Sequence, residues 1–208
     1  MLGFFLSAVL GYFLGSFPSG FIAGRIAGID VRQAGSGNIG ATNVTRLLGK
    51  RIGYLVFVLD FTKGALAAIL AMFLARNSGA REEIVELYAA VGGVFSVIGH
   101  SYPIWLSFKG GKGVATSIGM LFGLNWAAAM IVCVVWFVTF QLTRYVSLAS
   151  IAAALALPGA IGAMLLLGQL TTPVLLYFSL GLAALVILRH RSNLSRLFNG
   201  TEPRVIRK

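Results

Sequence analysis

Long apolar segments alternate with short polar ones along this chain. The apolar segments occupy residues 2–28, 52–75, 84–105, 146–167 and 173–188. Each is close to the roughly 20 residues that a helix needs to cross the hydrocarbon core of a bilayer. The pattern therefore predicts an all-α integral membrane protein, with a kink at Pro18 in the first helix. No basic stretch precedes the first segment and no small-residue cleavage site follows it, so we expect a retained helix rather than a signal peptide.

A further apolar segment, 114–142, is ambiguous, because it can form one long helix or two short helices that meet near Gly123-Leu124-Asn125. Charge favours two helices. With seven helices, most basic residues fall on one side of the membrane, which the positive-inside rule identifies as the cytoplasmic side. These residues are Arg32, Arg46, Lys50, Arg51, Lys109, Lys112, Arg144, Arg189, Arg191, Arg196, Arg204, Arg207 and Lys208.

Two basic residues, Arg76 and Arg81, fall on the other side, beside Glu82, Glu83 and Glu86. A single long helix at 114–142 would move Arg144 and the tail outside and would remove this charge bias. We therefore expect about seven transmembrane helices, with the N-terminus outside and the C-terminus in the cytoplasm. Both glycine-rich loops described below then lie on the cytoplasmic face.

Composition leaves little of the chain for anything but these helices. Hydrophobic residues make up 58% of the 208 residues, against roughly 45–50% in a soluble domain. We expect a single polytopic membrane domain over residues 1–208. The positive-inside bias accounts for the net charge of +11, and nucleic-acid binding is not expected. The single cysteine, Cys133, lies in an apolar segment, and no Cys/His cluster indicates a metal site.

The first glycine-rich loop reads GSGNIGATN at 35–43. Gly35, Gly37 and Gly40 have the spacing of a dinucleotide-binding fingerprint, and Asp60 follows about 20 residues later. That fingerprint follows a β-strand, whereas a membrane helix precedes this loop, so we reject dinucleotide binding. Exposed backbone N–H groups suit an anion. We expect the loop to bind phosphate together with polar side chains, namely Ser36, Asn38, Thr42, Asn43 and Arg46.

The second glycine-rich loop reads KGGKGVAT at 109–116. A nucleotide P-loop needs Ser or Thr after its lysine and a glycine five residues before it. Gly113 follows Lys112, and Ser107 stands five residues before it, so this is not a P-loop. The loop can still wrap a phosphate, with Lys109 and Lys112 as point charges and a helix that begins at Val114 beside the anion. The plainer alternative is a short turn with positive-inside lysines.

Two histidines lie next to polar segments. His100 lies near the cytoplasmic end of the third apolar segment, and His190 begins the tail. Histidine can act as a general base or donate a hydrogen bond to phosphate. Asn193 lies three residues after His190, on the same face if the helix continues. A capping or packing role is the alternative for each histidine.

Charged residues also occur where no obvious site explains them. Asp60 and Lys63 lie three residues apart within the second apolar segment, where a charge is costly unless it is paired. A mutual ion pair accounts for both, and a site role for Lys63 stays open. In the tail, basic residues are expected to attract anionic lipid, and Glu202 is expected to hold the tail by a salt bridge.

In chain order, these motifs resemble the bacterial PlsY family of acyl-phosphate-dependent glycerol-3-phosphate acyltransferases. The resemblance covers the whole chain and implies a seven-helix enzyme of the bacterial inner membrane with its active site on the cytoplasmic side. It rests on SGNIGATN at 36–43, on GHSYP at 99–103 with KGGKGVAT at 109–116, and on Arg189, His190, Asn193, Arg196, Gly200 and Glu202.

The family resemblance implies transfer of a fatty acyl group from acyl phosphate to the 1-hydroxyl of glycerol 3-phosphate. The products are lysophosphatidic acid and phosphate, in the first step of phospholipid synthesis. Both substrates carry phosphate, which agrees with two anion-binding loops. Acyl phosphate is already activated, so no cofactor or metal is expected, and a separate enzyme must supply it. Other glycerol-phosphate acyltransferases use a His-x-x-x-x-Asp pair, but Trp105 and Ser195 stand at the two possible Asp positions.

The resemblance also implies roles for individual residues. Ser36 and its loop would bind the acyl phosphate, and Arg46, Lys112, His190 and Asn193 would bind glycerol 3-phosphate, although which group holds which phosphate stays open. Ser36, Lys112, His190 and Asn193 are the expected catalytic residues. The expected substrate-binding residues are Gly35, Gly37, Asn38, Gly40, Thr42, Asn43, Arg46, His100, Lys109, Gly110, Gly111, Gly113, Thr116 and Arg196.

Two questions about the chemistry stay open at this point. The proton of the attacking hydroxyl can go to the leaving phosphate or to His190, whereas a covalent acyl-enzyme on Ser36 is disfavoured because no base is evident beside it. The alternative function is transport of a phosphorylated solute. The chain has no internal repeat, and both loops lie on one side, which argues against a transporter.

Overall fold

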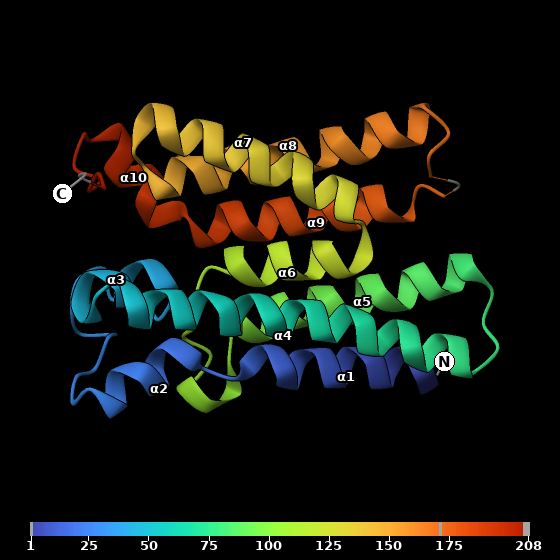
Figure 1. The fold of residues 1–208 in the computed structure, drawn as a ribbon, viewed down its shortest axis with the longest axis horizontal. Coiled ribbons are helices and arrows are strands. Elements are labelled where there is room, and N and C mark those ends of the chain that lie inside the picture. Colours follow the sequence, from blue (N-terminus) through green and yellow to red (C-terminus); the bar gives the residue numbers. More distant parts are fainter. Residues whose placement is uncertain (1, 171, 206–208) are drawn as a thin grey trace. The chain divides into compact units, whose positions relative to one another are not determined.

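The computed structural model describes residues 2–170 and 172–205, and every regular element within them is a helix (Figure 1). The all-α fold class is therefore confirmed. Arg207 and Lys208 lie outside the described residues. The chain divides into two compact units, one that ends at Leu124 and one that begins at Asn125. The single domain expected over residues 1–208 stays a prediction.

The first unit is built from six α-helices and one short 3₁₀ helix. Helices α1, α4, α5 and α6 pack side by side, and α2 and α3 lie at one end of α4 (Figure 1). The bounds are α1 Leu2–Ser16, α2 Ser19–Ile26, α3 Ala41–Leu48, α4 Lys50–Asn77, α5 Glu82–Ser101, η1 Ile104–Leu106 and α6 Val114–Leu124.

The predicted kink at Pro18 is a complete break between α1 and α2. Proline has no N–H to donate and its ring excludes a continued helix, so the chain turns at Phe17 and Pro18. Helix α2 then restarts at Ser19. Gly20 on α2 lies so close to the carbonyl oxygen of Ile39 that a Cβ atom would collide with it. The break therefore brings α2 against the first glycine-rich loop.

Small residues let α1 and α5 approach closely. A Cβ atom at Gly11 or Gly15 would collide with the carbonyl oxygens of Gly92 and Ser96, respectively. In lipid, apolar side chains gain little from leaving their surroundings, so helices associate through close backbone packing at small residues. These glycines therefore fix the spacing of the two helices that carry Tyr12 and His100.

The ambiguous segment 114–142 forms two helices, as the charge distribution predicted. Helix α6 ends at Leu124, and α7 (Trp126–Thr143) begins one residue after Asn125. Asn125 is the N-cap of α7, because its side chain accepts a hydrogen bond from the N–H of Ala128 at 2.9 Å. An N-cap residue has an extended backbone, so it ends one helix as it begins the next.

Within the described residues, five helical segments are long and apolar enough to cross a membrane, and there are six if the bent pair α9–α10 counts as one span. Helix α6 is the shorter seventh segment. Its 11 residues span only about 16 Å, roughly half of the hydrocarbon core. Before it, the second glycine-rich loop turns back along the end of α5, where Gly111 donates a hydrogen bond to the carbonyl oxygen of His100.

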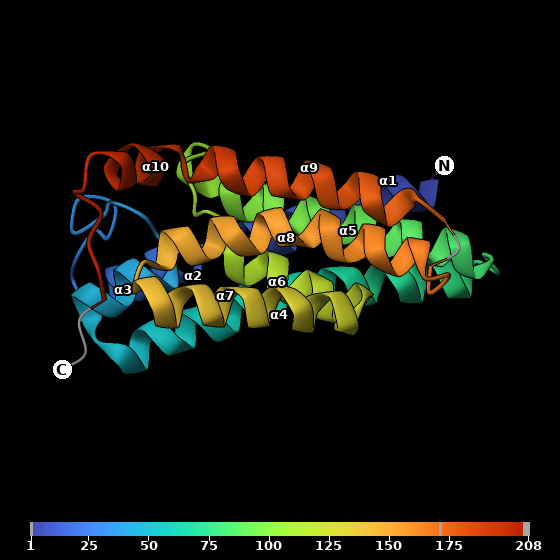
Figure 2. The same cartoon turned by 90° about the horizontal axis from the view of Figure 1, so that it is seen from above.

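The second unit consists of α7, α8 (Val146–Leu166), α9 (Val174–Arg189) and α10 (Arg191–Phe198). Helix α8 packs against both α7 and α9. Helices α9 and α10 meet at His190 with a bend of 59°, and Figure 2 shows α10 at that end of α9. The segment after α10 returns to the start of α8, where Arg204 lies over the ring of Tyr145, 4.9 Å from its centroid.

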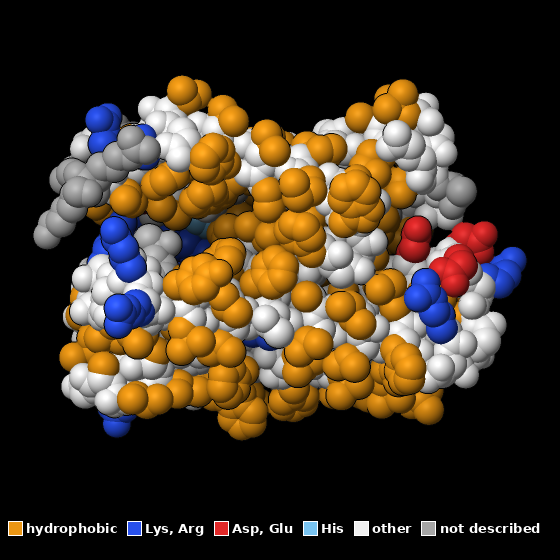
Figure 3. All heavy atoms as spheres, viewed as in Figure 1, with side chains coloured by type: hydrophobic (Ala, Val, Ile, Leu, Met, Phe, Trp, Pro, Cys, Tyr) orange, Lys and Arg blue, Asp and Glu red, His pale blue; other side chains and the backbone are white. Residues whose placement is uncertain are grey.

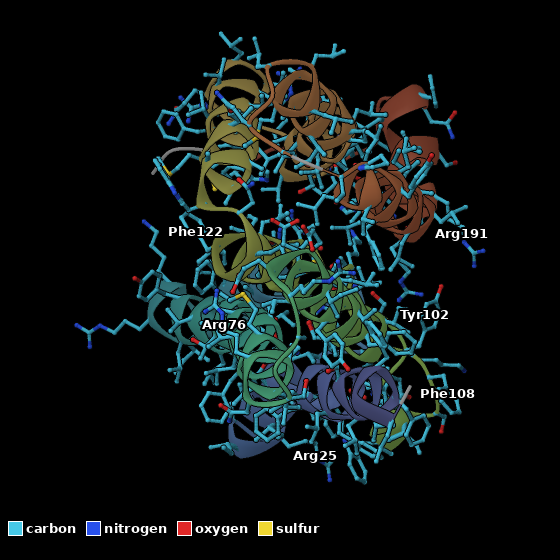
Figure 4. All side chains as sticks on the ribbon, turned by 90° about the vertical axis from the view of Figure 1, so that its right-hand side faces the viewer. Arg25, Arg76, Tyr102, Phe108, Phe122 and Arg191 are labelled. Atoms are coloured by element: carbon cyan, nitrogen blue, oxygen red, sulfur yellow. The ribbon has the colours of Figure 1, made fainter. Side chains whose placement is uncertain are left out.

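Charges of opposite sign gather where α4 meets α5. Arg76 and Glu82 form an exposed ion pair at 3.2 Å, and Figure 4 looks onto this end and labels Arg76. On the face drawn in Figure 3, the acidic side chains lie at this end of the first unit. The surface between its ends is apolar, as lipid contact requires. The orientation of the chain in a membrane stays a prediction.

Candidate active site

Two glycines shape the first loop. Gly35 and Gly37 have φ angles of +61° and +68°, in the left-handed region that a side chain disfavours. Gly35 also lies against the side-chain oxygen of Asn43. The loop therefore folds back on itself between α2 and α3, and Ser36 at its tip is exposed.

Asn43 holds this loop together from inside. Its side chain is 1% exposed and makes four hydrogen bonds. The oxygen accepts from the N–H of Ser36 at 2.8 Å. The amide nitrogen donates to carbonyl oxygens 2.9–3.1 Å away, those of Val31, Ala34 and Asn38. Asn43 was expected to bind substrate. The structure places it beneath the loop, where its amide shapes the loop's backbone.

The N-terminus of α3 opens towards the same loop. Its N-cap, Gly40, has an extended backbone and no side chain to cap the helix. The side chain of Asn38 accepts a hydrogen bond from the N–H of Gly40 at 2.8 Å. No side chain from the N-cap position bonds the N–H groups that follow in the first turn of α3. Uncapped N–H groups and the helix dipole favour an anion here. Thr42 in the first turn is exposed.

Two arginines near this loop differ in what they bind. Arg32 forms an ion pair with Asp30 at 2.6 Å and lies over the ring of Phe21, 4.6 Å from its centroid. Hydrogen bonds from the Arg32 side chain and backbone lower the pKa of Asp30 to about 2. Arg32 is therefore committed to Asp30. Arg46, on the last turn of α3, is exposed and is the better candidate for a substrate phosphate.

The second loop is attached to the end of α5 by its backbone. Gly110 and Gly111 donate to the carbonyl oxygens of Ser101 and His100 at 3.2 and 3.0 Å. Lys109 is exposed and Lys112 is half-buried, so their charges lie at different depths. Thr116, which was expected to bind substrate, is fully buried on α6.

One apolar cluster joins the two loops. Leu106, on η1 just before the second loop, packs with residues of the first loop and its flanking helices, namely Val31, Ile39, Val44 and Val56. All five are at most 5% exposed. The predicted convergence of the two loops is thus seen in packing, and it depends on Leu106, which no motif identified.

The tail residues meet around Glu202 in the second unit. Glu202 accepts hydrogen bonds from Ser147 Oγ and Asn193 Nδ2, both at 2.6 Å, and from Arg196 Nε at 2.7 Å. Gly200, with a φ of +68°, turns the chain back so that the N–H of Glu202 reaches the carbonyl oxygen of Arg196. The predicted salt bridge of Glu202 is confirmed. Ser147 was not anticipated.

His190 marks the bend between α9 and α10, so the helix doesn't continue straight through it. His190 and Asn193 are 2% and 5% exposed. The Nδ1 atom of His190 lies 2.8 Å from the carbonyl oxygen of Val186. A carbonyl only accepts, so Nδ1 carries a proton and the neutral ring has its lone pair on Nε2. Nε2 is the atom that can accept a proton or a hydrogen bond.

Comparison with known proteins shows the family of this chain. The family model "Glycerol-3-phosphate acyltransferase" matches residues 5–200. The chain belongs to this family. A glycerol-3-phosphate acyltransferase of Prochlorococcus marinus (strain NATL1A) is 45% identical over 196 residues, 94% of either chain. That of Brucella suis is 42% identical over 198 residues, 95% of this chain and 90% of the relative.

Solved structures agree with the sequence relatives. The crystal structure of PlsY, an integral membrane glycerol 3-phosphate acyltransferase, in its glycerol 3-phosphate form superposes with a TM-score of 0.84 at 39% identity. It covers 98% of this chain and 96% of that one. The structure of the same protein in its lysophosphatidic acid form superposes with a TM-score of 0.82. This protein is therefore a membrane glycerol-3-phosphate acyltransferase of the PlsY family, and the resemblance seen in its motifs is confirmed.

Within the acyltransferase, residues 2–170 and 172–205 contain no group of three His, Cys, Asp or Glu side chains that could hold a metal ion. The predicted ion pair of Asp60 and Lys63 is present, with 2.9 Å between Oδ1 and Nζ. His100 approaches the same oxygen, with 3.6 Å between its Nδ1 and Asp60 Oδ1. His100 is 4% exposed, deeper than the expected substrate-binding role suggested.

Proposed function

We propose that this acyltransferase uses acyl phosphate as its donor and forms lysophosphatidic acid. The proposed reaction moves the fatty acyl group to the 1-hydroxyl of glycerol 3-phosphate and releases phosphate. The observation that carries the proposal is the pair of glycine-rich loops joined by the cluster around Leu106. A phosphorylated donor and a phosphorylated acceptor need two anion sites, which the two loops would supply.

The first loop and the start of α3 are proposed to bind the phosphate of the acyl donor. Ser36 is exposed at the loop tip, with Gly35, Gly37 and Gly40 giving an anion access to the backbone. The N–H groups at the start of α3 add a positive dipole end. Asn38 and Thr42 lie beside them. Arg46 supplies charge from the last turn of the helix.

The second loop is proposed to bind the phosphate of glycerol 3-phosphate. Lys112 and Lys109 supply charge, and Gly110, Gly111 and Gly113 keep the backbone near the anion. From the second unit, His190 and Asn193 are proposed to bind the same substrate. Arg196 is held by Glu202 at 2.7 Å, so we propose that it acts by fixing the tail.

We infer that the leaving phosphate, rather than a protein base, takes the proton of the attacking hydroxyl. An acyl phosphate is a mixed anhydride. The phosphate that departs from the carbonyl carbon is a base close enough to accept the proton of the attacking hydroxyl. In the proposed step the hydroxyl oxygen forms the new ester bond, the carbonyl–phosphate bond breaks, and phosphate leaves with the proton. His190 then orients the hydroxyl through Nε2 and contributes by proximity.

Replacing His190 with glutamine tests this assignment. Glutamine retains a hydrogen-bonding end, so we expect a higher KM for glycerol 3-phosphate with kcat within about tenfold of the parental value. A general base contributes about 10²–10⁴-fold, so a loss of that size in kcat at saturating substrate would make His190 the base. Arg191→Gln is the matched control, because Arg191 is exposed and projects outward from α10 (Figure 4).

The donor is tested with purified protein in detergent. We expect lysophosphatidic acid from palmitoyl phosphate and glycerol 3-phosphate, without added metal, and none from palmitoyl-CoA. A tube without glycerol 3-phosphate measures hydrolysis of the donor. Product from palmitoyl-CoA alone, or no product from either donor, would overturn acyl phosphate as the donor while leaving the family assignment intact.

The same assay in sealed vesicles tests the proposed location in the bacterial inner membrane. We propose that both loops face the cytoplasm, because Arg46, Lys50 and Lys109 lie near them and acidic residues lie at the other end of α4 and α5. Inside-out vesicles are then expected to use externally added glycerol 3-phosphate, and right-side-out vesicles to use none until they are opened. The reverse result would place the loops outside.

A further inference from the structure

Four polar side chains meet in the interior of the first unit, away from both loop tips. They come from three helices, α2, α4 and α5. All are at most 6% exposed. They are Ser19, Asp60, Lys63 and His100.

Asp60 is the centre of this cluster. Its Oδ1 atom accepts from Ser19 Oγ at 2.6 Å, lies 2.9 Å from Lys63 Nζ and 3.6 Å from His100 Nδ1. Lys63 also donates to the carbonyl oxygen of Phe17 at 3.0 Å. That carbonyl lies in the break between α1 and α2, where it also accepts from the N–H of Ser19 at 3.1 Å. The cluster thus ties the break to α4 and α5.

Stability alone does not account for two charges at this depth. Removing ions from water costs several kcal/mol each, and apolar side chains of similar volume commonly replace a buried ion pair without loss of stability. Ionisable residues inside a membrane protein are correspondingly rare and associated with function. Neither Asp60 nor Lys63 belongs to a loop that is proposed to bind substrate. A role in substrate binding therefore has to act through a neighbouring residue.

His100 is that neighbour, because it contacts the cluster on one side and the second loop on the other. Its Nδ1 faces Asp60, whereas Gly111 lies so close to Nε2 that a Cβ atom there would collide with it. The carbonyl oxygen of His100 also accepts from the N–H of Gly111 at 3.0 Å. The position of the imidazole ring therefore sets the position of Gly111, and Lys112 is the next residue.

We propose that Asp60, Lys63 and Ser19 are positioning residues that hold His100, and through it the Gly111-Lys112 backbone, in the geometry that binds the phosphate of glycerol 3-phosphate. This inference rests on the proposed role of the second loop. His100 acts here by packing and orientation, without touching substrate. Asp60 fixes the ring from the Nδ1 side, and Lys63 keeps the carboxylate neutralised and in place.

The double variant D60L/K63M separates positioning from simple charge balance. It removes both charges together and leaves side chains of similar size, so the unfolding midpoint in detergent is expected to stay close to the parental one. The single variant D60L leaves Lys63 unpaired and is expected to unfold earlier. In the double variant we expect the KM for glycerol 3-phosphate to rise about tenfold or more, with a smaller change in kcat.

A parental KM in a stable D60L/K63M protein would overturn the proposal. The matched control is R76Q/E82Q, which removes the exposed ion pair of the α4–α5 junction and is expected to leave KM unchanged. Lys112→Met gives the reference for loss of the phosphate contact. An unchanged KM in K112M would overturn the proposed site and this inference together, whereas an effect in K112M without one in the double variant would overturn this inference alone.

A second test avoids the charged residues, in case D60L/K63M does not fold. Ser19→Ala removes one hydrogen bond to Asp60, and we expect KM to rise about threefold. If the cluster acts through His100, Ser19→Ala has no further effect in a His100→Ala background. A threefold increase in both backgrounds would overturn the proposal. KM is measured with whichever acyl donor the parental protein uses, so an incorrect donor assignment does not affect either test.

Discussion

Replacing Asn43 with alanine is expected to reduce acyl transfer by about 100-fold or more. The substitution removes all four hydrogen bonds of a side chain that is 1% exposed. The N–H of Ser36 and the carbonyls of Val31 and Asn38 lose this partner, whereas the carbonyl of Ala34 keeps the N–H of Gly37 at 3.0 Å. Each buried polar group left unpaired costs about 1–3 kcal/mol. Water reaches the exposed tip of the loop and offsets part of this free-energy cost, so we expect a larger effect on activity than on stability.

The reason that activity is expected to fall more than stability is geometric. The loop's path depends on Asn43 as a single connection between Ser36 and three carbonyls on either side of it. Without it, the glycines at 35 and 37 leave the backbone free to rearrange, and the N–H groups no longer converge on one anion. The rest of the first unit is held by helix packing that Asn43 does not touch, so the helices are expected to remain.

The measurement is kcat/KM with purified Asn43→Ala, alongside its unfolding midpoint in detergent. Asn43→Asp is the sharper variant, because it keeps the oxygen that accepts from Ser36 but turns the donor end into an acceptor facing three carbonyls. We expect it to be at least as inactive. Asn199→Ala, at the exposed end of α10, is the control and is expected to remain active. Near-parental activity in Asn43→Ala would show that the loop does not need its internal amide.

Replacing Glu202 with alanine is expected to lower the stability of the second unit by about 3 kcal/mol and to remove most activity. Removing one partner of a buried charged network leaves the others unpaired, which costs more than the network contributes. Here Ser147, Asn193 and Arg196 all lose a carboxylate acceptor. Asn193 is also an expected catalytic residue, so the loss of its hydrogen-bond partner is expected to lower activity as well as stability.

The same carboxylate gives a pH dependence with a defined sign. Burial raises the pKa of Glu202, but hydrogen bonds from Ser147, Asn193 and Arg196 outweigh it and hold the pKa below its ordinary value of 4.5. The folded protein therefore binds the proton less readily than the unfolded chain. The resulting stabilisation is fully present above about pH 4.5 and is lost as the pH falls through the lowered pKa.

Unfolding midpoints from pH 7 to pH 3 test this in the parental protein and in Glu202→Gln. Glutamine keeps the shape without a charge, so the parental advantage over this variant is expected to shrink below about pH 4.5. Glu83→Gln, an exposed residue in the first turn of α5, serves as the control and is expected to follow the parental curve. A parental advantage that is constant with pH would mean that the charge of Glu202 contributes nothing.

Much of this fold could be predicted from local signals. Apolar length marked the helices, Pro18 marked the break between α1 and α2, and the charge bias divided 114–142 where Asn125 caps α7. The ion pair of Asp60 and Lys63 followed from their spacing in an apolar segment. Except for the charge bias, which is summed over the whole chain, these features depend on residues that are close in the chain.

The sequence by itself thus determined the class of the protein, its helices and the two glycine-rich loops, whereas the tertiary structure decided which polar side chains are buried in support of the loops and which are exposed. Ser19 reaches Asp60 across 41 residues and Ser147 reaches Glu202 across 55. A buried serine can equally bond a carbonyl of its own helix, as Ser96 and Ser150 do, and sequence does not distinguish the two. Helix packing makes this choice. Residues such as the close-fitting glycines of the α1–α5 contact set that packing, and no local preference encodes it.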